Sequence, residues 1–270
     1  MGIIFVLDLD GTIIGDCVYQ AEIYKICLIL SKLGIKIKIN EILDNYYKEK
    51  SRLVRPYFTY FMRKMREIYP SISIYIYTAS EKKWAEKEIN IIEKTLDIKF
   101  NRPIFTRNDC IKVYSKEEDR IDYKKSIEMI KKRMRVKDKD AEIMIIDDKD
   151  VYIDNRERMI KCDIYNYRYF CNYWDYIPIE KVNNKIFLKY LRTLIDNNRL
   201  NPNYNPMTMK QSINYYKWLY EKTMEINRKN NKRYKDDKFW LKLTNVIVDS
   251  KISIFNNNAI KYIEKSLTMD

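Results

Sequence analysis

The chain has 270 residues, a formal net charge of +14 at pH 7 and no histidine. Hydrophobic residues make up 46% of the sequence and aromatic residues 14%, which excludes a wholly disordered, collagen-like or disulfide-scaffold protein. Without histidine, the chain holds no Ser-His-Asp or Cys-His catalytic set, no His-ligated zinc site and no His general base. Hydrolytic chemistry has to rest on carboxylates, lysine, hydroxyl groups or an oxygen-ligated metal.

The cysteines and the apolar runs indicate where in the cell the protein is expected. The five cysteines form no Cys-x-x-Cys pair, and their odd number argues against a disulfide framework. We therefore expect reduced thiols and an intracellular protein of the cytoplasm or nucleus. The apolar start of the chain is short and acids follow it at once, which favours a buried strand over a signal peptide. Charged residues interrupt every longer apolar run, so the sequence predicts no membrane span and no membrane partner.

The positive charge is unevenly distributed. Residues 180–270 carry 18 lysines and arginines against 9 aspartates and glutamates, and the basic residues are densest between residues 228 and 238. The sequence favours Ile, Lys, Asn and Tyr over Gly, Pro and Ala, which is typical of an AT-rich coding genome. Lysine drift is therefore one explanation of the charge, and a contact with nucleic acid through this basic C-terminal third is the other.

Apolar periodicity predicts alternating strands and helices over the first two thirds of the chain. Strands are expected at 3–8, 72–77, 142–146 and 162–165, with short strand and loop over 98–115. Helices are expected at 18–33, 40–51, 57–68, 81–95 and 122–134. Beyond about residue 179 the strand patterns fade, and helices are expected at 185–197 and 208–230.

This alternation is typical of an α/β domain with a mostly parallel sheet. In such sheets, ligands bind beyond the carboxyl ends of the strands. Acids follow two of the predicted strands, Asp8 and Asp10 after the first and Asp147 and Asp148 after a later one. Thr78 follows a third strand. We expect these side chains to meet in one site.

The segment DLDGT at residues 8–12 carries the chemistry. Two carboxylates just past a buried strand repel one another unless they share a cation or a proton. A hard divalent cation removes this repulsion, and Mg2+ suits the oxygen ligands. One carboxylate can then attack phosphorus and form an aspartyl-phosphate, while the other transfers protons. Gly11 allows a tight turn whose backbone N–H groups can hold an anionic group.

DLDGT resembles motif I of the haloacid dehalogenase (HAD) phosphohydrolase superfamily. Further segments are similar, in order, to the NLI-interacting-factor-like phosphatases, the family of the RNA polymerase II C-terminal-domain (CTD) phosphatases. These segments are Arg55-Pro56, IYTAS at 76–80, FTRNDC at 105–110 and IIDDKD at 145–150. The resemblance covers roughly residues 1–175, and four ordered matches are a stronger indication than DLDGT alone.

The resemblance implies a fold and its divisions. The expected fold is α/β, a HAD-like (Rossmannoid) three-layer parallel sheet with a small helical insert and a helical C-terminal extension. We expect the phosphatase domain over residues 1–178, with a small helical cap over 17–50, and a basic, mostly helical extension over 179–270. The small CTD phosphatases carry a short β insertion that helps grip the peptide. Here no clear three-stranded pattern lies near 96–120, where only a weak hairpin is indicated.

The resemblance also implies roles for individual residues. Asp8 would be the nucleophile and a Mg2+ ligand. Asp10 would be the general acid and base, and a ligand through its backbone carbonyl. Thr78 would bond the transferring phosphoryl group. Asp147, with Asp148 beside it, would complete the acidic metal ligands.

The family also has a lysine, in its motif III, that neutralises the phosphoryl group and the nucleophile. The segment DYKKSIEMI offers Lys124 or Lys125 for this role. We favour Lys125, because Lys-Ser-Ile is similar to the family's Lys-Asp-Leu. Thr12, Ser80 and Arg107 are further candidates for substrate binding. None of these roles requires a histidine.

These residues predict a Mg2+-dependent phosphatase that acts through an aspartyl-phosphate. The resemblance implies a phosphoserine or phosphothreonine protein as substrate, and the basic last third suggests a nucleotide or a nucleic-acid end as the alternative. A non-enzymatic nucleic-acid or transcription-associated binding module is the other class of function. The intact set of acids argues against that class, because unused buried carboxylates would be costly.

Overall fold

The computed structural model describes residues 2–15, 30–35, 47, 52–116, 119–137, 141–168 and 208–268. The predicted cap at 17–50 lies mostly outside these residues, and the predicted helix at 185–197 lies wholly outside them. The division of the chain at residue 178 stays a prediction, since that position also falls outside the described part.

Among the described residues, four parallel strands form the central sheet, in the order β2–β1–β5–β6. Their bounds are β1 (Gly2–Leu7), β2 (Ser73–Ile76), β5 (Ala141–Asp147) and β6 (Met159–Lys161). β1 lies in the middle, where Ile4 is opposite Ser73 on one side and Ile143 on the other. β1 is buried from Ile4 to Leu7, as expected of an apolar strand that is covered on both faces.

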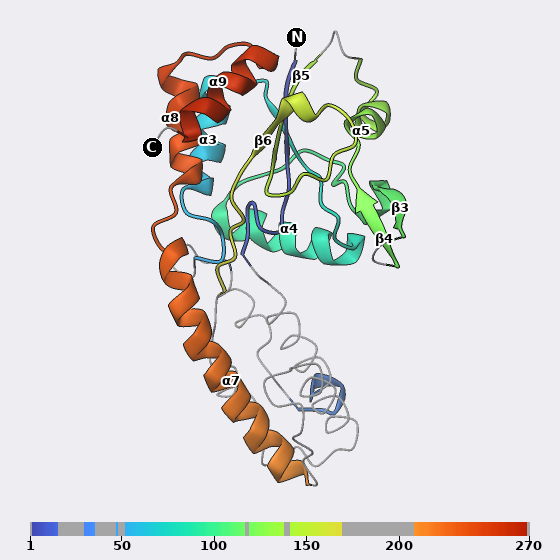
Figure 1. Ribbon diagram of the computed structural model, residues 1–270, viewed down its shortest axis with the longest axis vertical. Helices are drawn as coiled ribbons and strands as arrows, with labels where there is room; N and C mark the ends of the chain where they lie inside the picture. The colour runs from blue at the N-terminus through green and yellow to red at the C-terminus, as the bar shows by residue number, and fades with distance from the viewer. Residues whose placement is uncertain are drawn as a thin grey trace.

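Side chains of β1 alternate between two hydrophobic layers. Phe5 and Leu7 pack in the same layer as α3 (Phe58–Ile68), α4 (Lys82–Leu96), α8 (Phe239–Asp249) and α9 (Asn257–Thr268). Ile4 and Val6 pack on the opposite face with α5 (Ile127–Met134). Figure 1 shows α3, α8 and α9 on one side of the sheet and α5 on the other. The predicted α/β fold, a three-layer parallel sheet, is confirmed.

The helices α8 and α9 share the core of the sheet domain. Trp240 of α8 is fully buried, and its ring centre lies 5.0 Å from that of Phe58 and 4.6 Å from that of Phe61. Both phenylalanines belong to α3. α9 adds Ile260 and Ile263 to the same core. These C-terminal residues therefore complete one face of the sheet.

A longer helix, α7 (Met209–Asn231), precedes them in the chain. It begins with a capping box between Thr208 and Gln211, and its start lies far from the sheet domain, toward which the helix runs (Figure 1). A short 3-10 turn, η7 (Lys232–Tyr234), follows it and leads toward α8. In the described part of the chain, no helix combines the length and the apolar character that crossing a membrane requires.

The helix predicted at 122–134 is wrong at its start. Residues 120–124 instead form β4 (Arg120–Lys124), which pairs antiparallel with β3 (Ile111–Ser115). The helix begins at Ile127 because Ser126 caps it, with a side chain that accepts a hydrogen bond from the backbone N–H of Met129. The hairpin that was only weakly indicated is therefore present, as two strands.

The strand predicted at 162–165 is also wrong. Among the described residues the last strand is β6, and it ends at Lys161. The N–H of Cys162 donates to the carbonyl of Asp147 at 3.0 Å, and the N–H of Tyr165 donates to the carbonyl of Gly11 at 2.7 Å. The first bond is the last contact of this segment with β5, and the second draws it toward the turn after β1, so it does not continue as a strand.

Replacing Trp240 by alanine should lower the free energy of unfolding by about 3–5 kcal/mol, the usual cost of truncating a large buried aromatic side chain. Urea unfolding at pH 7, followed by circular dichroism, measures this loss. Ile254→Ala is the control, because Ile254 is 53% exposed. An exposed position should change by less than about 0.5 kcal/mol. Equal losses in the two variants would mean that α8 does not share the core.

Candidate active site

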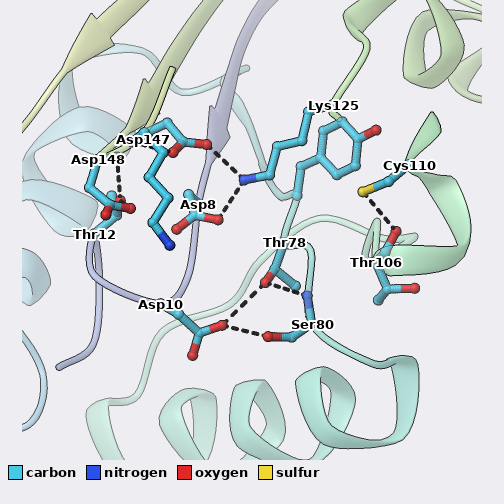
Figure 2. A network of polar contacts seen from close by, with 12 residues as sticks. Asp8, Asp10, Thr12, Thr78, Ser80, Thr106, Cys110, Lys125, Asp147 and Asp148 are labelled. Atoms are coloured by element: carbon cyan, nitrogen blue, oxygen red, sulfur yellow. Dashed lines mark hydrogen bonds and ion pairs between the residues drawn. The ribbon is translucent and has the colours of Figure 1, made fainter. Parts of the chain in front are cut away.

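Three strand ends bring polar side chains together at the carboxyl edge of the sheet (Figure 2). Asp8 follows β1, Thr78 lies just beyond β2, and Asp147 ends β5. Backbone bonds hold two of these positions. The N–H of Asp8 donates to the carbonyl of Ile146 at 2.9 Å, and that of Thr78 donates to Phe105 at 3.0 Å. The parallel sheet therefore assembles residues that lie far apart in the sequence.

Lys125 supplies the positive charge of the site. Its Nζ lies 2.5 Å from Oδ1 of Asp8 and 2.7 Å from Oδ2 of Asp147, and all three residues are buried. The backbone of Lys125 is held by hydrogen bonds to Val151 and Ile153. Of the two lysines in this segment, Lys125 is therefore the one whose ammonium group lies between the carboxylates.

Two tyrosine rings flank this ammonium group, and the sequence interpretation missed both. Nζ of Lys125 lies 5.6 Å from the centre of the Tyr77 ring and 5.7 Å from that of Tyr152. Both rings are fully buried, so they keep water away from the ammonium group, and their π faces attract its positive charge. Tyr77 directly precedes Thr78, which was a usable signal. Tyr152 forms a short β-bridge with Lys125, and nothing in the sequence marks it.

The carboxylates of Asp8, Asp147 and Asp148 form an acidic cluster that fits a divalent cation. Each offers an oxygen within 4.8 Å of the others, and all three residues are buried. Oδ2 of Asp148 is buried and finds no hydrogen-bond partner among the described residues. A buried acceptor without a partner is what a bound cation would satisfy. A small set of hard oxygen donors suits Mg2+, so the residues present fit this metal.

Gly11 allows the turn after β1 to approach this cluster. Its φ of +87° lies in the left-handed region that favours glycine. A Cβ atom at this position would lie 2.9 Å from Oδ2 of Asp148. Any larger residue would therefore push against the carboxylate that fits the cation.

Asp10 has different surroundings from Asp8. Its Oδ2 accepts hydrogen bonds from Oγ of Ser80 at 2.7 Å and from Oγ1 of Thr78 at 3.3 Å (Figure 2). Asp10 is partly exposed, and its carboxylate is not part of the acidic cluster found among the described residues. The two carboxylates of DLDGT thus differ in burial and in partners, which suits them to different chemical tasks.

The other residues that were predicted to bind substrate have contacts of their own. Thr12 is fully buried, and its Oγ1 accepts a hydrogen bond from the backbone N–H of Asp148 at 3.1 Å. Arg107 lies beside the Thr78–Ser80 segment, where its Nε donates to the carbonyl of Ala79 at 2.8 Å. Its side chain is 38% exposed. In this arrangement Thr12 orients Asp148, and Arg107 stands at the rim of the site.

Burial changes the protonation of the cluster. It raises the pKa of Asp8 to about 8, against the opposing effect of Lys125 and with smaller contributions from Asp147 and Asp10. Burial also raises the pKa of Asp148, and the charge of Asp147 adds to the shift. For Lys125, burial disfavours the charge, but the neighbouring carboxylates outweigh it and hold its pKa well above the ordinary value. Asp8 therefore holds a proton near neutral pH that a metal would displace.

A parallel α/β sheet with an aspartate after its first strand, a lysine between carboxylates and a second acidic pair is the arrangement that the resemblance to HAD-type phosphatases predicts. The family model of the NLI interacting factor-like phosphatases matches residues 3–173, which is well over half of the chain. The chain belongs to this family. No match to the chain is found among curated proteins.

Solved structures with some likeness to the chain include two of the RNA polymerase II CTD phosphatase Fcp1. One is a fission yeast Fcp1 variant bound to beryllium fluoride, with 18% identity and a TM-score of 0.37. The chain is covered to 97% and spans 60% of that protein chain. The other Fcp1 structure has 16% identity and a TM-score of 0.38, with coverages of 96% and 68%. The HAD domain of effector protein Lem4 from Legionella pneumophila has 16% identity and a TM-score of 0.32, with coverages of 69% and 96%.

Mg2+ should stabilise the folded protein more strongly at pH 8 than at pH 6. The pKa of Asp8 is raised from 3.8 to about 8 in the folded state, so Mg2+ has to displace a proton within this window. Without metal, the same shift makes stability fall as the pH rises through the window, because the unfolded chain has already lost that proton. At a concentration of 100 Kd the stabilisation amounts to about 2.7 kcal/mol. Thermal melting with and without Mg2+ measures it.

The control for this measurement is Asp148→Asn. It keeps the size of the side chain but removes one charged ligand, so it should reduce the Mg2+ effect at both pH values. An Mg2+ effect that is equal at pH 6 and pH 8, or unchanged in Asp148→Asn, would contradict the assignment of the cluster.

Proposed function

We propose that the protein is a Mg2+-dependent phosphatase that hydrolyses phosphoric monoesters through an aspartyl-phosphate on Asp8. One observation carries the proposal. Asp8 lies against Lys125 in a buried acidic cluster, whereas Asp10, two residues away, is partly exposed and bound by hydroxyl groups. Two carboxylates with such different environments suit one nucleophile and one acid–base group.

In the first step, a carboxylate oxygen of Asp8 attacks the phosphorus atom and the bond to the leaving oxygen breaks. Asp10 donates a proton to that oxygen, so the product leaves as an alcohol. In the second step, Asp10 takes a proton from water, and the water oxygen attacks the same phosphorus atom. Inorganic phosphate is released and Asp8 is restored.

Three further groups stabilise the charge that develops on the phosphoryl oxygens. Lys125 holds its ammonium group beside Asp8, and the buried rings of Tyr77 and Tyr152 keep that charge away from water. Thr78 lies next to Asp10 and presents a hydroxyl group. Mg2+ bound by Asp8, Asp147, Asp148 and the backbone carbonyl of Asp10 would neutralise the phosphoryl oxygens and favour the deprotonated nucleophile.

We take a phosphoserine or phosphothreonine protein as the first candidate substrate, because the chain belongs to the NLI interacting factor-like phosphatase family. Nucleotides and phosphorylated nucleic-acid ends come second, on the strength of the basic residues after residue 180. Some of that charge is internally paired, since Lys222 and Lys229 both form ion pairs with Glu225 on α7. An intracellular location, in the cytoplasm or nucleus, is likewise proposed from the cysteine usage.

Asp8→Asn should abolish Mg2+-dependent turnover of p-nitrophenyl phosphate, because an amide cannot form the aspartyl-phosphate. Asp10→Asn should lower kcat by about 10²–10⁴-fold, the usual contribution of a general acid or base. Steady-state kinetics measure both losses. Trapping of a hydroxylamine-sensitive phosphoryl label, present in the wild type and absent in Asp8→Asn, tests the intermediate directly. Full activity of folded Asp8→Asn would overturn the mechanism.

A panel of phosphopeptides, nucleotides and 5′- or 3′-phosphorylated oligonucleotides separates the substrate classes. We expect the highest kcat/KM on phosphopeptides. Salt-sensitive binding to RNA or DNA, without turnover of any phosphate ester, would instead identify a binding module.

A further inference from the structure

Arg55 is a buried charge that the proposed chemistry does not use. It is 2% exposed, and it precedes α3 by three residues. Its Nε and Nη2 donate to the two carboxylate oxygens of Asp237 at 2.8 and 2.9 Å, and its Nη1 donates to the carbonyl of Asp163 at 3.0 Å. The guanidinium also lies 4.6 Å from the centre of the Phe239 ring. All these contacts stay within the protein, so the group holds other segments together.

The first of these segments is the turn after β1. The backbone N–H of Arg55 donates to the carbonyl of Ile13 at 2.8 Å, and the N–H of Gly15 donates to the carbonyl of Leu53 at 2.8 Å. The strand-like pairing between residues 13–15 and 53–55 therefore begins one residue after Thr12. Its position sets where the DLDGT turn can lie.

The second segment runs from Cys162 to Tyr165. Arg55 binds it through Asp163, and the segment binds the site at both of its ends. Cys162 donates its N–H to the carbonyl of Asp147 and contacts Oγ1 of Thr12 through its thiol at 3.8 Å. Tyr165 donates its N–H to the carbonyl of Gly11. A shift of this segment would move both the DLDGT turn and the metal ligands.

The third segment belongs to the C-terminal helices. Asp237 lies between η7 and α8. Its Oδ1 also accepts a hydrogen bond, at 3.1 Å, from the N–H of Phe239, which is the first residue of α8. α8 is in turn fixed to α3 by the burial of Trp240. Asp237 lies beyond residues 3–173, the range that the family model matches. The partner of Arg55 therefore comes from outside the matched domain.

We propose that the Arg55–Asp237 ion pair is a positioning contact through which the C-terminal helices hold the DLDGT turn and the segment 162–165 in the geometry that phosphoryl transfer requires. This inference rests on the proposed function. The planar guanidinium binds the carboxylate with two parallel hydrogen bonds and keeps a third donor for Asp163, which fixes direction as well as distance. Neither residue contacts the reacting atoms, so the pair acts through Gly11, Thr12 and Asp147.

The test compares Asp237→Asn with Asp236→Asn in the full chain. Both variants remove one negative charge, but Asp236 is exposed and adjacent. A displacement of about 1 Å in a catalytic group can cost about 10²-fold in rate. We therefore expect Asp237→Asn to lower kcat for p-nitrophenyl phosphate about tenfold to a hundredfold, with KM within about threefold of the wild type. Asp236→Asn should behave as the wild type.

Mg2+ binding, measured by thermal melting at pH 8, is a second readout that does not depend on turnover. Mg2+ demands nearly ideal geometry, so Asp237→Asn should also weaken its binding. The wild type could show this Mg2+ effect and yet turn over no phosphate ester. The proposed function would then fail, but a weaker Mg2+ effect in Asp237→Asn would still support the positioning contact. If Asp237→Asn has a kcat within twofold of the wild type and unchanged Mg2+ binding, the positioning role of the ion pair is overturned.

Arg55→Lys keeps the charge but loses the pair of parallel hydrogen bonds to the carboxylate of Asp237. If Asp237→Asn does not fold, the kcat of Arg55→Lys tests the positioning role instead. In the double variant Arg55→Lys/Asp237→Asn, the loss in kcat should be no greater than the larger single loss, because the two residues act as one unit. Independent, multiplying losses would overturn the proposal. If both single variants unfold below the assay temperature, the pair is a stabilising contact only, and the proposal is likewise overturned.

Discussion

The ammonium group of Lys125 lies between the carboxylates of Asp8 and Asp147, and all three side chains are buried. Such charges are tolerated in the interior only when they are paired, and removal of one partner of a buried pair typically costs about 3–5 kcal/mol. For this pairing to form, β1 and β5 have to lie side by side, and the segment just before α5 has to pack against their carboxyl ends. The stability of the site and the arrangement of its reactive groups therefore depend on the same contact.

Three carboxylates around one ammonium group leave an excess of negative charge, which the protein meets in different ways. The pKa of Asp8 is raised to about 8, so a proton takes the place of a cation there, and burial raises the pKa of Asp148 as well. The carboxylate of Asp10 lies outside the cluster, where Ser80 and Thr78 donate hydrogen bonds to it. A buried acidic cluster with one unpartnered carboxylate oxygen, together with a separate, partly exposed carboxylate, forms a site suited to phosphoryl transfer.

Local patterns were sufficient for the strands that carry the acids. The run before Asp8 and the run before Asp147 are apolar and short, and acids end both of them, so the strands and their active edge could be predicted. The segment 120–124 was misread because its alternation of charged and apolar residues is short and passes directly into helical spacing. The segment 162–165 looked like a strand, but a hydrogen bond from Tyr165 to Gly11 turns it toward the segment after β1. Gly11 is far away in the sequence, so no local pattern could indicate this contact.

The sequence by itself determined the class of chemistry. A chain without histidine, with DLDGT after an apolar strand and a second acidic pair after another, is restricted to carboxylates, lysine and an oxygen-bound metal. Only the tertiary structure decided which lysine lies between the acids, which rings surround it and which carboxylate oxygen is left without a partner. It also joined Arg55 to Asp237, 182 residues further along the chain. The physical reason is that reactivity follows from residue type and local order, whereas burial and charge pairing exist only after distant segments have packed together.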